Sequence, residues 1–233
     1  MPVPFLLEIA VESVEAARAA ERGGAHRIEL CANLHNGGTT PSVELQRAAR
    51  AALRIPIHVL IRPRDGNFVY SKSELESMKQ QIDAAKQAGA SGVVLGLLNA
   101  NQSVDVQATR ELVRQADPLP VTFHRAFDET PGLLQALEDV CSTGAKRILT
   151  SGGAKDAITG IPTLQRLLAA AGDRIIVMPG GGIHSENVSE LLDVTGAREI
   201  HSGLGTVLKY GSEDVATFES EVRKLATQIR ENT

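Results

Sequence analysis

Short apolar runs alternate along the chain with longer stretches in which Ala and Leu recur at helical spacing. Four runs rich in branched apolar residues, at positions 5–9, 57–61, 121–124 and 175–178, have the length and composition of buried parallel strands. The intervening stretches predict helices, of which the clearest cover residues 14–22, 43–53, 74–88, 106–116, 133–141 and 215–229. The pattern therefore predicts alternating strands and helices.

Four more strands follow a repeated junction in which a Gly starts the run into the strand. The junctions cover residues 24–29, 89–94, 144–149 and 196–201. Each Gly stands where a helix would end, because Gly tolerates the left-handed conformation that closes a helix. The chain thus contains eight strand-helix units, whose spacing suits a βα unit of roughly 30 residues.

Strict βα alternation is compatible with a closed eight-stranded barrel or with an open doubly wound sheet. Eight compact units in 233 residues favour the barrel, which typically needs about 250 residues. An open dinucleotide-binding sheet usually has a glycine-rich turn after its first strand, whereas residues 9–13 (IAVES) contain no glycine. No linker divides the chain. We therefore predict an α/β fold, a single (β/α)8 TIM barrel that forms one domain over residues 1–233.

Period-two alternation assigns the strand side chains to the two faces of this barrel. Leu7, Ile28, Val59 and Phe123 would pack outward against helices, which turns their neighbours inward. These inward positions are unusually polar: Glu8, Arg27, Glu29, His58, Arg62, Thr122, His124, Glu199 and His201. Some could be paired ions low in the barrel. Because buried charge is costly and barrel active sites lie at the carboxyl ends of the strands, the cluster there predicts a functional site.

Three of these inward residues are candidates for acid–base catalysis. His124 ends the fifth strand within residues 122–128 (TFHRAFD), and histidine can titrate near neutrality. A facing Glu8 or Glu29 could set the charge of His124 during proton transfer. We predict Glu8, Glu29 and His124 as catalytic residues that share one pocket with Arg62. The alternative is that His124 is a hydrogen-bonded structural group.

Arginines and glycines at the same end of the barrel predict an anion site. Residues 62–70 (RPRDGNFVY) place two arginines and two aromatic rings past the third strand, which suits a carboxylate or phosphate, although the arginines could instead pair with surface acids. Glycines after strands six, seven and eight could present amides to an anion or simply allow tight turns. The predicted anion-binding residues are Arg62, Arg64, Arg125, Asp128, Ser151, Gly181, Gly182, Ser202 and Gly203.

Composition limits the partners. The net charge of −4, five Phe, two Tyr and no Trp argue against a nucleic-acid surface. No apolar run approaches the roughly 18 residues of a membrane span. The first 17 residues contain no Lys or Arg, and Glu8 interrupts the only early apolar stretch, so we do not expect a secretory signal peptide. We expect a cytoplasmic protein without a membrane partner, and a homo-oligomer because most soluble oligomers are of that kind.

Sulfur ligands are scarce. Cys31 follows the second strand, Met178 ends the seventh strand, and Cys141 lies in a predicted helix. Two isolated cysteines are too few for a disulfide framework. Cu(I) favours several soft ligands, and Cys31 is the weak candidate for a metal ligand; its alternative role is that of a small buried hydrophobe. A harder Zn or Mn site would use the inward glutamates and histidines, but no HExxH-like spacing is present.

Several segments together resemble the CutC copper-homeostasis family. They are residues 24–31 (GAHRIELC), 37–42 (GGTTPS), 61–64 (IRPR), 68–71 (FVYS), 121–128 (VTFHRAFD), 148–152 (ILTSG) and 178–182 (MPGGG). The resemblance implies a cytosolic TIM barrel that acts in copper homeostasis and binds Cu(I), without an established enzymatic reaction. The family's first strand often ends in Leu-Glu-[Ile/Val]-Cys, whereas this chain has Ala10 in the last position, which weakens direct copper binding and leaves Cys31.

Three functional classes stay open. One is a copper-handling protein that uses Cys31; the second is an enzyme that holds a small anionic or phosphorylated metabolite on Arg62, Arg64 and the glycine loops and moves protons with His124 and a glutamate. The residues favour the second class. A metal-dependent nuclease of the barrel type is disfavoured by the acidic balance. The ligand is therefore either a small anion or Cu(I).

Overall fold

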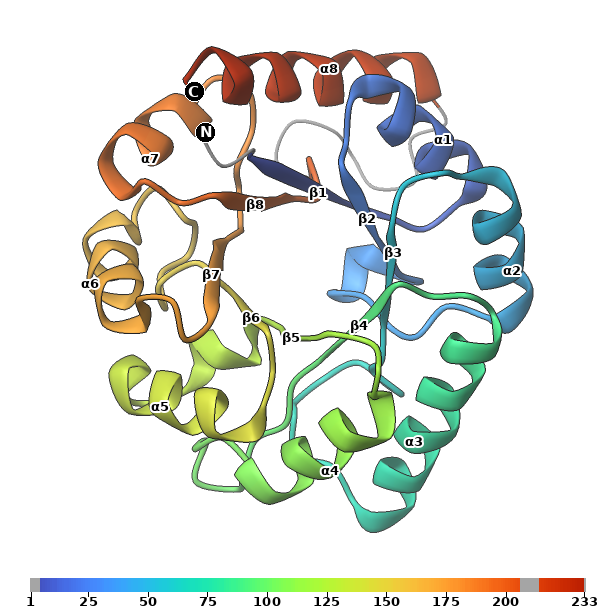
Figure 1. The fold of residues 1–233 in the computed structure, drawn as a ribbon, viewed down its shortest axis with the longest axis vertical. Coiled ribbons are helices and arrows are strands. Elements are labelled where there is room, and N and C mark those ends of the chain that lie inside the picture. The colour runs from blue at the N-terminus through green and yellow to red at the C-terminus, as the bar shows by residue number, and fades with distance from the viewer. Residues whose placement is uncertain (1–4, 206–213, 233) are drawn as a thin grey trace.

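The computed structural model describes residues 5–205 and 214–232, in which eight strands alternate with eight α-helices. Figure 1 shows the strands around a central axis and the helices outside them. The strands are β1 (Leu6–Val11), β2 (Arg27–Leu30), β3 (Ile57–Leu60), β4 (Gly92–Leu95), β5 (Val121–Phe123), β6 (Arg147–Thr150), β7 (Ile176–Pro179) and β8 (Glu199–Ser202). The helices are α1 (Val14–Gly23), α2 (Val43–Ala52), α3 (Lys72–Gln87), α4 (Val106–Ala116), α5 (Leu133–Thr143), α6 (Ile161–Ala171), α7 (Val188–Thr195) and α8 (Val215–Glu231). Two short 3-10 helices, η1 (Leu34–Asn36) and η2 (Arg125–Glu129), follow β2 and β5.

The strands form one parallel sheet that nearly closes on itself. Their order is β7-β6-β5-β4-β3-β2-β1-β8. A parallel bridge between Gly180 and His201 joins the two edge strands. This confirms the predicted (β/α)8 TIM barrel and brings all eight strand ends to one mouth.

The helices cover the outer face of the sheet, and their ends follow the local sequence. Gly24 and Gly144 end α1 and α5 with φ of 102° and 91°, the left-handed conformation expected at the Gly junctions. A capping box between Ser71 and Glu74 starts α3. No helix in the described ranges combines the length and the apolar character needed to cross a membrane.

The strand register brings the inward polar residues side by side. Leu7, Ile28 and Phe123 are fully buried in the apolar core, as the alternation predicts. Inside the barrel, Glu8 is in register with Arg27 on one side and with His201 on the other. Parallel pairing of neighbouring strands thus builds a polar cluster from residues far apart in the sequence.

Candidate functional site

A cavity of about 400 Å³ lies at the carboxyl ends of the strands. Its polar wall consists of Glu29, Cys31, Arg62, His124, Arg125 and His201. Leu34, Leu60, Phe68, Leu149 and Leu204 contribute apolar surface, and Gly181, Gly182 and Gly203 contribute backbone. An apolar pocket with a few convergent polar groups is the usual form of a small-molecule site.

Arg62 is a buried cation on this wall. Only 6% of the residue is exposed. Its Nη1 donates to the carbonyls of Gly37 and Gly38, at 3.1 and 2.8 Å, and its Nη2 donates to the carbonyl of Gly66 at 2.7 Å. The guanidinium lies over the ring of Phe68, 5.0 Å from its centroid. Within the described residues it forms no ion pair with a carboxylate, and its buried Nε has no hydrogen-bond partner, although its charge acts on the buried hydroxyl of Tyr70.

His124 contributes a second unsatisfied nitrogen to the wall. Its Nδ1 accepts from the amide of Ala126 at 3.1 Å, which leaves the proton of the neutral ring on Nε2. That Nε2 is buried and has no partner in the described part of the chain. Burial lowers the pKa of His124 to about 3, and the positive charge of Arg62 adds to the effect. His124 is therefore a neutral hydrogen-bond donor at neutral pH.

Glu29 and His201 form the part of the wall that can exchange protons. The Nε2 of His201 lies 3.7 Å from Oε2 of Glu29. Burial raises the pKa of Glu29 to about 7, against the opposing effect of His201. Burial alone would lower the pKa of His201, but its hydrogen bond to Glu8 and the charge of Glu29 outweigh burial and raise it. A carboxyl group that titrates near neutrality is suited to general acid–base catalysis.

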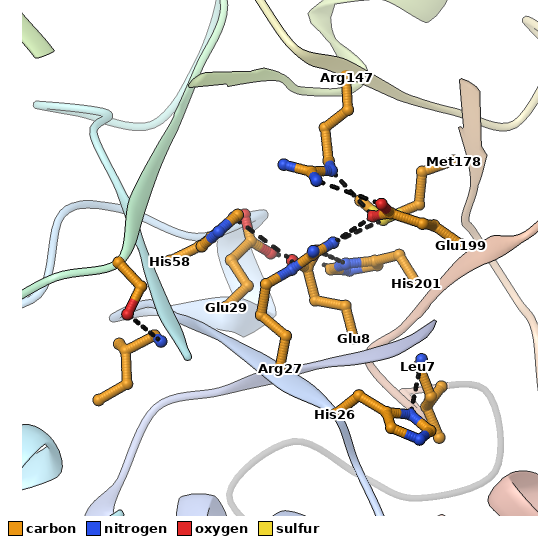
Figure 2. A network of polar contacts seen from close by, with 12 residues as sticks. Leu7, Glu8, His26, Arg27, Glu29, His58, Arg147, Met178, Glu199 and His201 are labelled. Carbon is orange, nitrogen blue, oxygen red and sulfur yellow. Dashed lines mark hydrogen bonds and ion pairs between the residues drawn. The ribbon is translucent and has the colours of Figure 1, made fainter. Parts of the chain in front are cut away.

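A chain of ion pairs lies below the cavity, inside the barrel (Figure 2). Glu8 accepts from Nε of Arg27 and lies 2.8 Å from Nδ1 of His201. Arg27 also donates to Glu199 at 2.8 Å, and Glu199 accepts from Nε of Arg147 at 2.9 Å. Although burial opposes ionisation, the charges of Arg27 and the neighbouring histidines hold the pKa of Glu8 well below its usual range.

The loop after β6 is tied to η2 by Asp128. This carboxylate accepts from the hydroxyl of Thr150, from the amides of Ser151 and Gly153, and from Nε of Arg125 at 2.8 Å. Arg125 also donates to the hydroxyl of Ser151 at 2.8 Å. Asp128 and Ser151 therefore hold Arg125 at the cavity without lining it themselves.

The structure brings some of the predicted site residues to the cavity and places others away from it. Glu29, Arg62, His124, Arg125, Gly181, Gly182, Gly203 and Cys31 line it. Glu8 lies beneath it, and Ser202 supports the β8 loop by donating to the carbonyl of Ile183 at 2.6 Å. Arg64 does not line the cavity, because its guanidinium contacts Glu74 at the start of α3, the carbonyls of Asn67 and Val69, and the ring of Tyr70.

Sulfur atoms do not converge at the mouth. Burial and the charges of Glu29 and Glu8 raise the pKa of the Cys31 thiol well above its usual value. Met178, the other sulfur considered for copper, accepts a contact from Nη2 of Arg27 at 3.3 Å instead of lining the cavity. No group of three or more His, Cys, Asp or Glu side chains in the described ranges is arranged to hold a metal ion.

Five polar residues of this region lie outside the predicted catalytic and anion-binding set: Arg27, His58, Arg147, Glu199 and His201. His201 lines the cavity, and the alternation in the sequence predicts only its inward direction. The same alternation places Arg147 inward on β6, a position absent from the predicted inward set. Both signals were present in the sequence. The partner that each side chain contacts becomes evident only from the strand register.

Comparisons with known proteins agree on one family. A family model described as CutC family matches residues 5–206. A protein of Agrobacterium fabrum named family protein CutC is 46% identical and covers 97% of this chain and 94% of its own length. The human protein named copper homeostasis protein cutC homolog is 47% identical over 84% of this chain and 72% of its own. The crystal structure of a CutC protein from Streptococcus agalactiae superposes with a TM-score of 0.81 at 34% identity, covering 85% of this chain and 98% of that one.

Proposed function

The chain belongs to the CutC family. For this member of the family we propose that the barrel mouth binds a small anionic metabolite and that a side chain of the mouth removes a proton from the bound metabolite and returns it. The negatively charged group of the ligand contacts Arg62 and His124. Glu29 acts as the general acid or base. Arg125 and the glycine amides after β7 and β8 hold the remainder of the ligand.

The observation that carries this proposal is the buried positive charge of Arg62, which no described carboxylate balances. A buried charge is costly unless it is paired, and here the guanidinium contacts carbonyl oxygens but no carboxylate among the described residues. The Nε of Arg62 and the Nε2 of His124 are buried donors without an acceptor, and both residues line the cavity. An anionic ligand would supply acceptor oxygens to both donors once the two side chains turn toward it.

Other lining residues of the cavity support a ligand with a second polar end. The Arg125 side chain is 42% exposed and is held by Asp128, so its charge is available to a ligand. Gly181 and Gly182 have φ of 108° and 70°, a backbone conformation that can turn amides toward an anion. A phosphorylated or carboxylated metabolite of few carbons fits a cavity of about 400 Å³.

Copper is the ligand that the name of the human relative suggests, and the residues present fit it poorly. Cu(I) prefers several soft ligands that are deprotonated. Among the described residues, Cys31 is the one sulfur residue that lines this cavity, and its raised thiol pKa opposes thiolate formation. We therefore propose that Cu(I) binding by this chain is weak and that copper takes no part in the proton transfer. We place the protein in the cytosol, as the family resemblance implies.

The test is a binding screen by thermal shift and calorimetry with small carboxylates, sugar phosphates and inorganic phosphate. We expect at least one of these anions to stabilise the wild type. Arg62→Ala should weaken its affinity about ten- to a hundredfold, which corresponds to the roughly 1.5 to 3 kcal/mol of a hydrogen bond to a charged group. Arg64→Ala is the matched control, because Arg64 lies outside the cavity, and it should leave the affinity nearly unchanged.

Two results would overturn the proposal. In the first, no anion stabilises the wild type. In the second, Arg62→Ala and Arg64→Ala bind the anion as tightly as the wild type, which would mean that Arg62 only holds the loop at residues 36–38 in place.

A further inference from the structure

We propose that Glu29 and His201 share a single mobile proton, and that Glu8 is the positioning residue that directs His201 toward Glu29. This inference rests on the proposed function and deepens it, because it assigns the class of reaction. One carboxyl group would both remove a proton from the ligand and return it.

The geometry begins with the hydrogen bond between Glu8 and His201. Oε1 of Glu8 lies 2.8 Å from Nδ1 of His201, and an ionised carboxylate can only accept, so Nδ1 carries a proton. In the neutral ring the other nitrogen, Nε2, is then an acceptor. It lies 3.7 Å from Oε2 of Glu29, and both residues line the cavity. A modest approach of these two atoms would allow a proton to pass between them.

Charge balance explains why one proton is shared. Below the pair, the guanidinium groups of Arg27 and Arg147 offset the carboxylates of Glu8 and Glu199. The remaining pair, Glu29 and His201, holds one further proton besides the one on Nδ1 of His201. The pair is neutral overall whether this proton lies on Nε2 of His201, opposite a Glu29 carboxylate, or on Glu29 itself. Neither arrangement leaves a net buried charge. The ion pair has the higher desolvation cost, and the attraction between its two charges, together with the hydrogen bond from Nδ1 of His201 to Glu8, offsets that cost.

The two arrangements have opposite chemistry toward a ligand. With the proton on His201, the Glu29 carboxylate is a base. With the proton on Glu29, the carboxyl group is an acid. When Glu29 takes a proton from the ligand, the electron pair of the broken bond stays on the ligand, and the added positive charge of the pair offsets the negative charge that the ligand gains. Returning the proton to a different atom of the ligand completes an isomerisation and restores the starting state of the Glu29–His201 pair.

Other charged groups also surround the pair and enter its titration. Glu8 of β1, Arg27 of β2 and Cys31, which follows β2, act on the pair directly. His58 of β3, Arg147 of β6 and Glu199 of β8 belong to the network beneath it, and Arg62, His124 and Arg125 line the same cavity. Burial lowers the pKa of His58 to about 4, so this ring stays neutral when the pair titrates. Cys31 stays protonated because its thiol pKa is raised.

The experiment is nuclear magnetic resonance on the ligand-free protein, with ¹⁵N-labelled histidine and ¹³C-labelled glutamate carboxyl groups. His201→Gln and Glu29→Gln identify the two signals. In the wild type we expect a protonated Nδ1 on His201, and we expect both signals to change over the same pH intervals, as coupled sites do. In Glu29→Gln the titration of His201 should become a single step, with a pKa lower by about 1 to 3 because an opposite charge is lost.

Glu8→Gln tests the positioning role. The amide oxygen can still accept from Nδ1, but the charge is lost, so the pKa of His201 should again fall by about 1 to 3. Glu199→Gln is the matched control, because it makes the same change in the same network without contact to His201, and it should keep the two-step titration. Should Glu8→Gln fail to fold, the wild type and Glu29→Gln still decide the outcome.

The proposal is overturned if the His201 proton resides on Nε2 in the neutral ring, or if Glu29 and His201 titrate independently. These measurements need no ligand. A failed anion screen with coupled titration would therefore reject the proposed function alone, and successful anion binding with independent titration would reject only the shared proton.

Discussion

The imidazole of His124 occupies the space that a side chain at position 96 would need. A Cβ added to Gly96 would clash with Nδ1 of His124. The same relationship holds four residues earlier, at the start of β4, where a Cβ at Gly92 would lie 2.5 Å from Nε2 of His58. The two glycines of this segment thus make room for imidazoles that come from the strands on either side of it.

Gly96→Ala should therefore disturb the cavity wall as well as stability. Overpacking of this kind typically costs about 1 to 3 kcal/mol, and the displaced ring of His124 should weaken binding of any anion that the wild type binds. Urea unfolding and calorimetry measure the two effects. Gly132→Ala is the control, because a Cβ there meets no atom within 4 Å. Equal stability of the two variants would show that the His124 ring is free to move aside.

His124 should remain neutral down to acid pH. Its folded pKa is about 3, whereas an unfolded imidazole titrates near 6.5. As the pH falls below about 6.5, the unfolded state gains a proton that the folded state does not, so the native state loses stability. His124→Gln should remove this part of the acid sensitivity. Unfolding experiments between pH 4 and pH 7 measure it, and a His124 ring that titrates near 6.5 by magnetic resonance would contradict the expectation.

Glu29 should have the opposite effect on stability. Because burial raises its folded pKa to about 7, its contribution is fully present below the unfolded pKa of about 4.5 and is lost as the pH rises through 7. Glu29→Gln should thus stabilise the protein at pH 8 by as much as a few kcal/mol, since one pKa unit corresponds to about 1.4 kcal/mol. Denaturant unfolding at pH 5 and pH 8 measures the difference. Equal effects at both pH values would contradict a raised pKa.

Cu(I) should bind weakly. A single protonated thiol lacks the several soft ligands of a tight site, so an anaerobic titration against a competing chelator should show no stoichiometric retention of copper. Cys31→Ala should abolish what binding remains at the mouth, and Cys141→Ala in α5 is the matched control. Tight binding that survives Cys31→Ala would place a copper site elsewhere on the chain. Tight binding lost with Cys31 would favour copper handling over anion chemistry.

Local sequence was sufficient to predict the barrel and the inward direction of its polar residues. A strand side chain alternates between two faces whatever its surroundings, so Glu8, Glu29 and His124 had to share the interior once their apolar neighbours packed on helices. The Gly junctions carried equal information, because Gly24 and Gly144 adopt the left-handed conformation that ends a helix.

The partners of those residues were decided by the tertiary structure. Arg62 and Arg64 stand two positions apart in one loop, yet Arg62 contacts the carbonyls of Gly37 and Gly38, and Arg64 contacts Glu74. The likeness of the two arginines in the sequence hides this difference, because a long side chain takes whichever acceptors the fold brings within reach. Alternation along a strand determines the face on which a residue lies, whereas its charge, its pKa and its role depend on neighbours that only the closing of the barrel brings together.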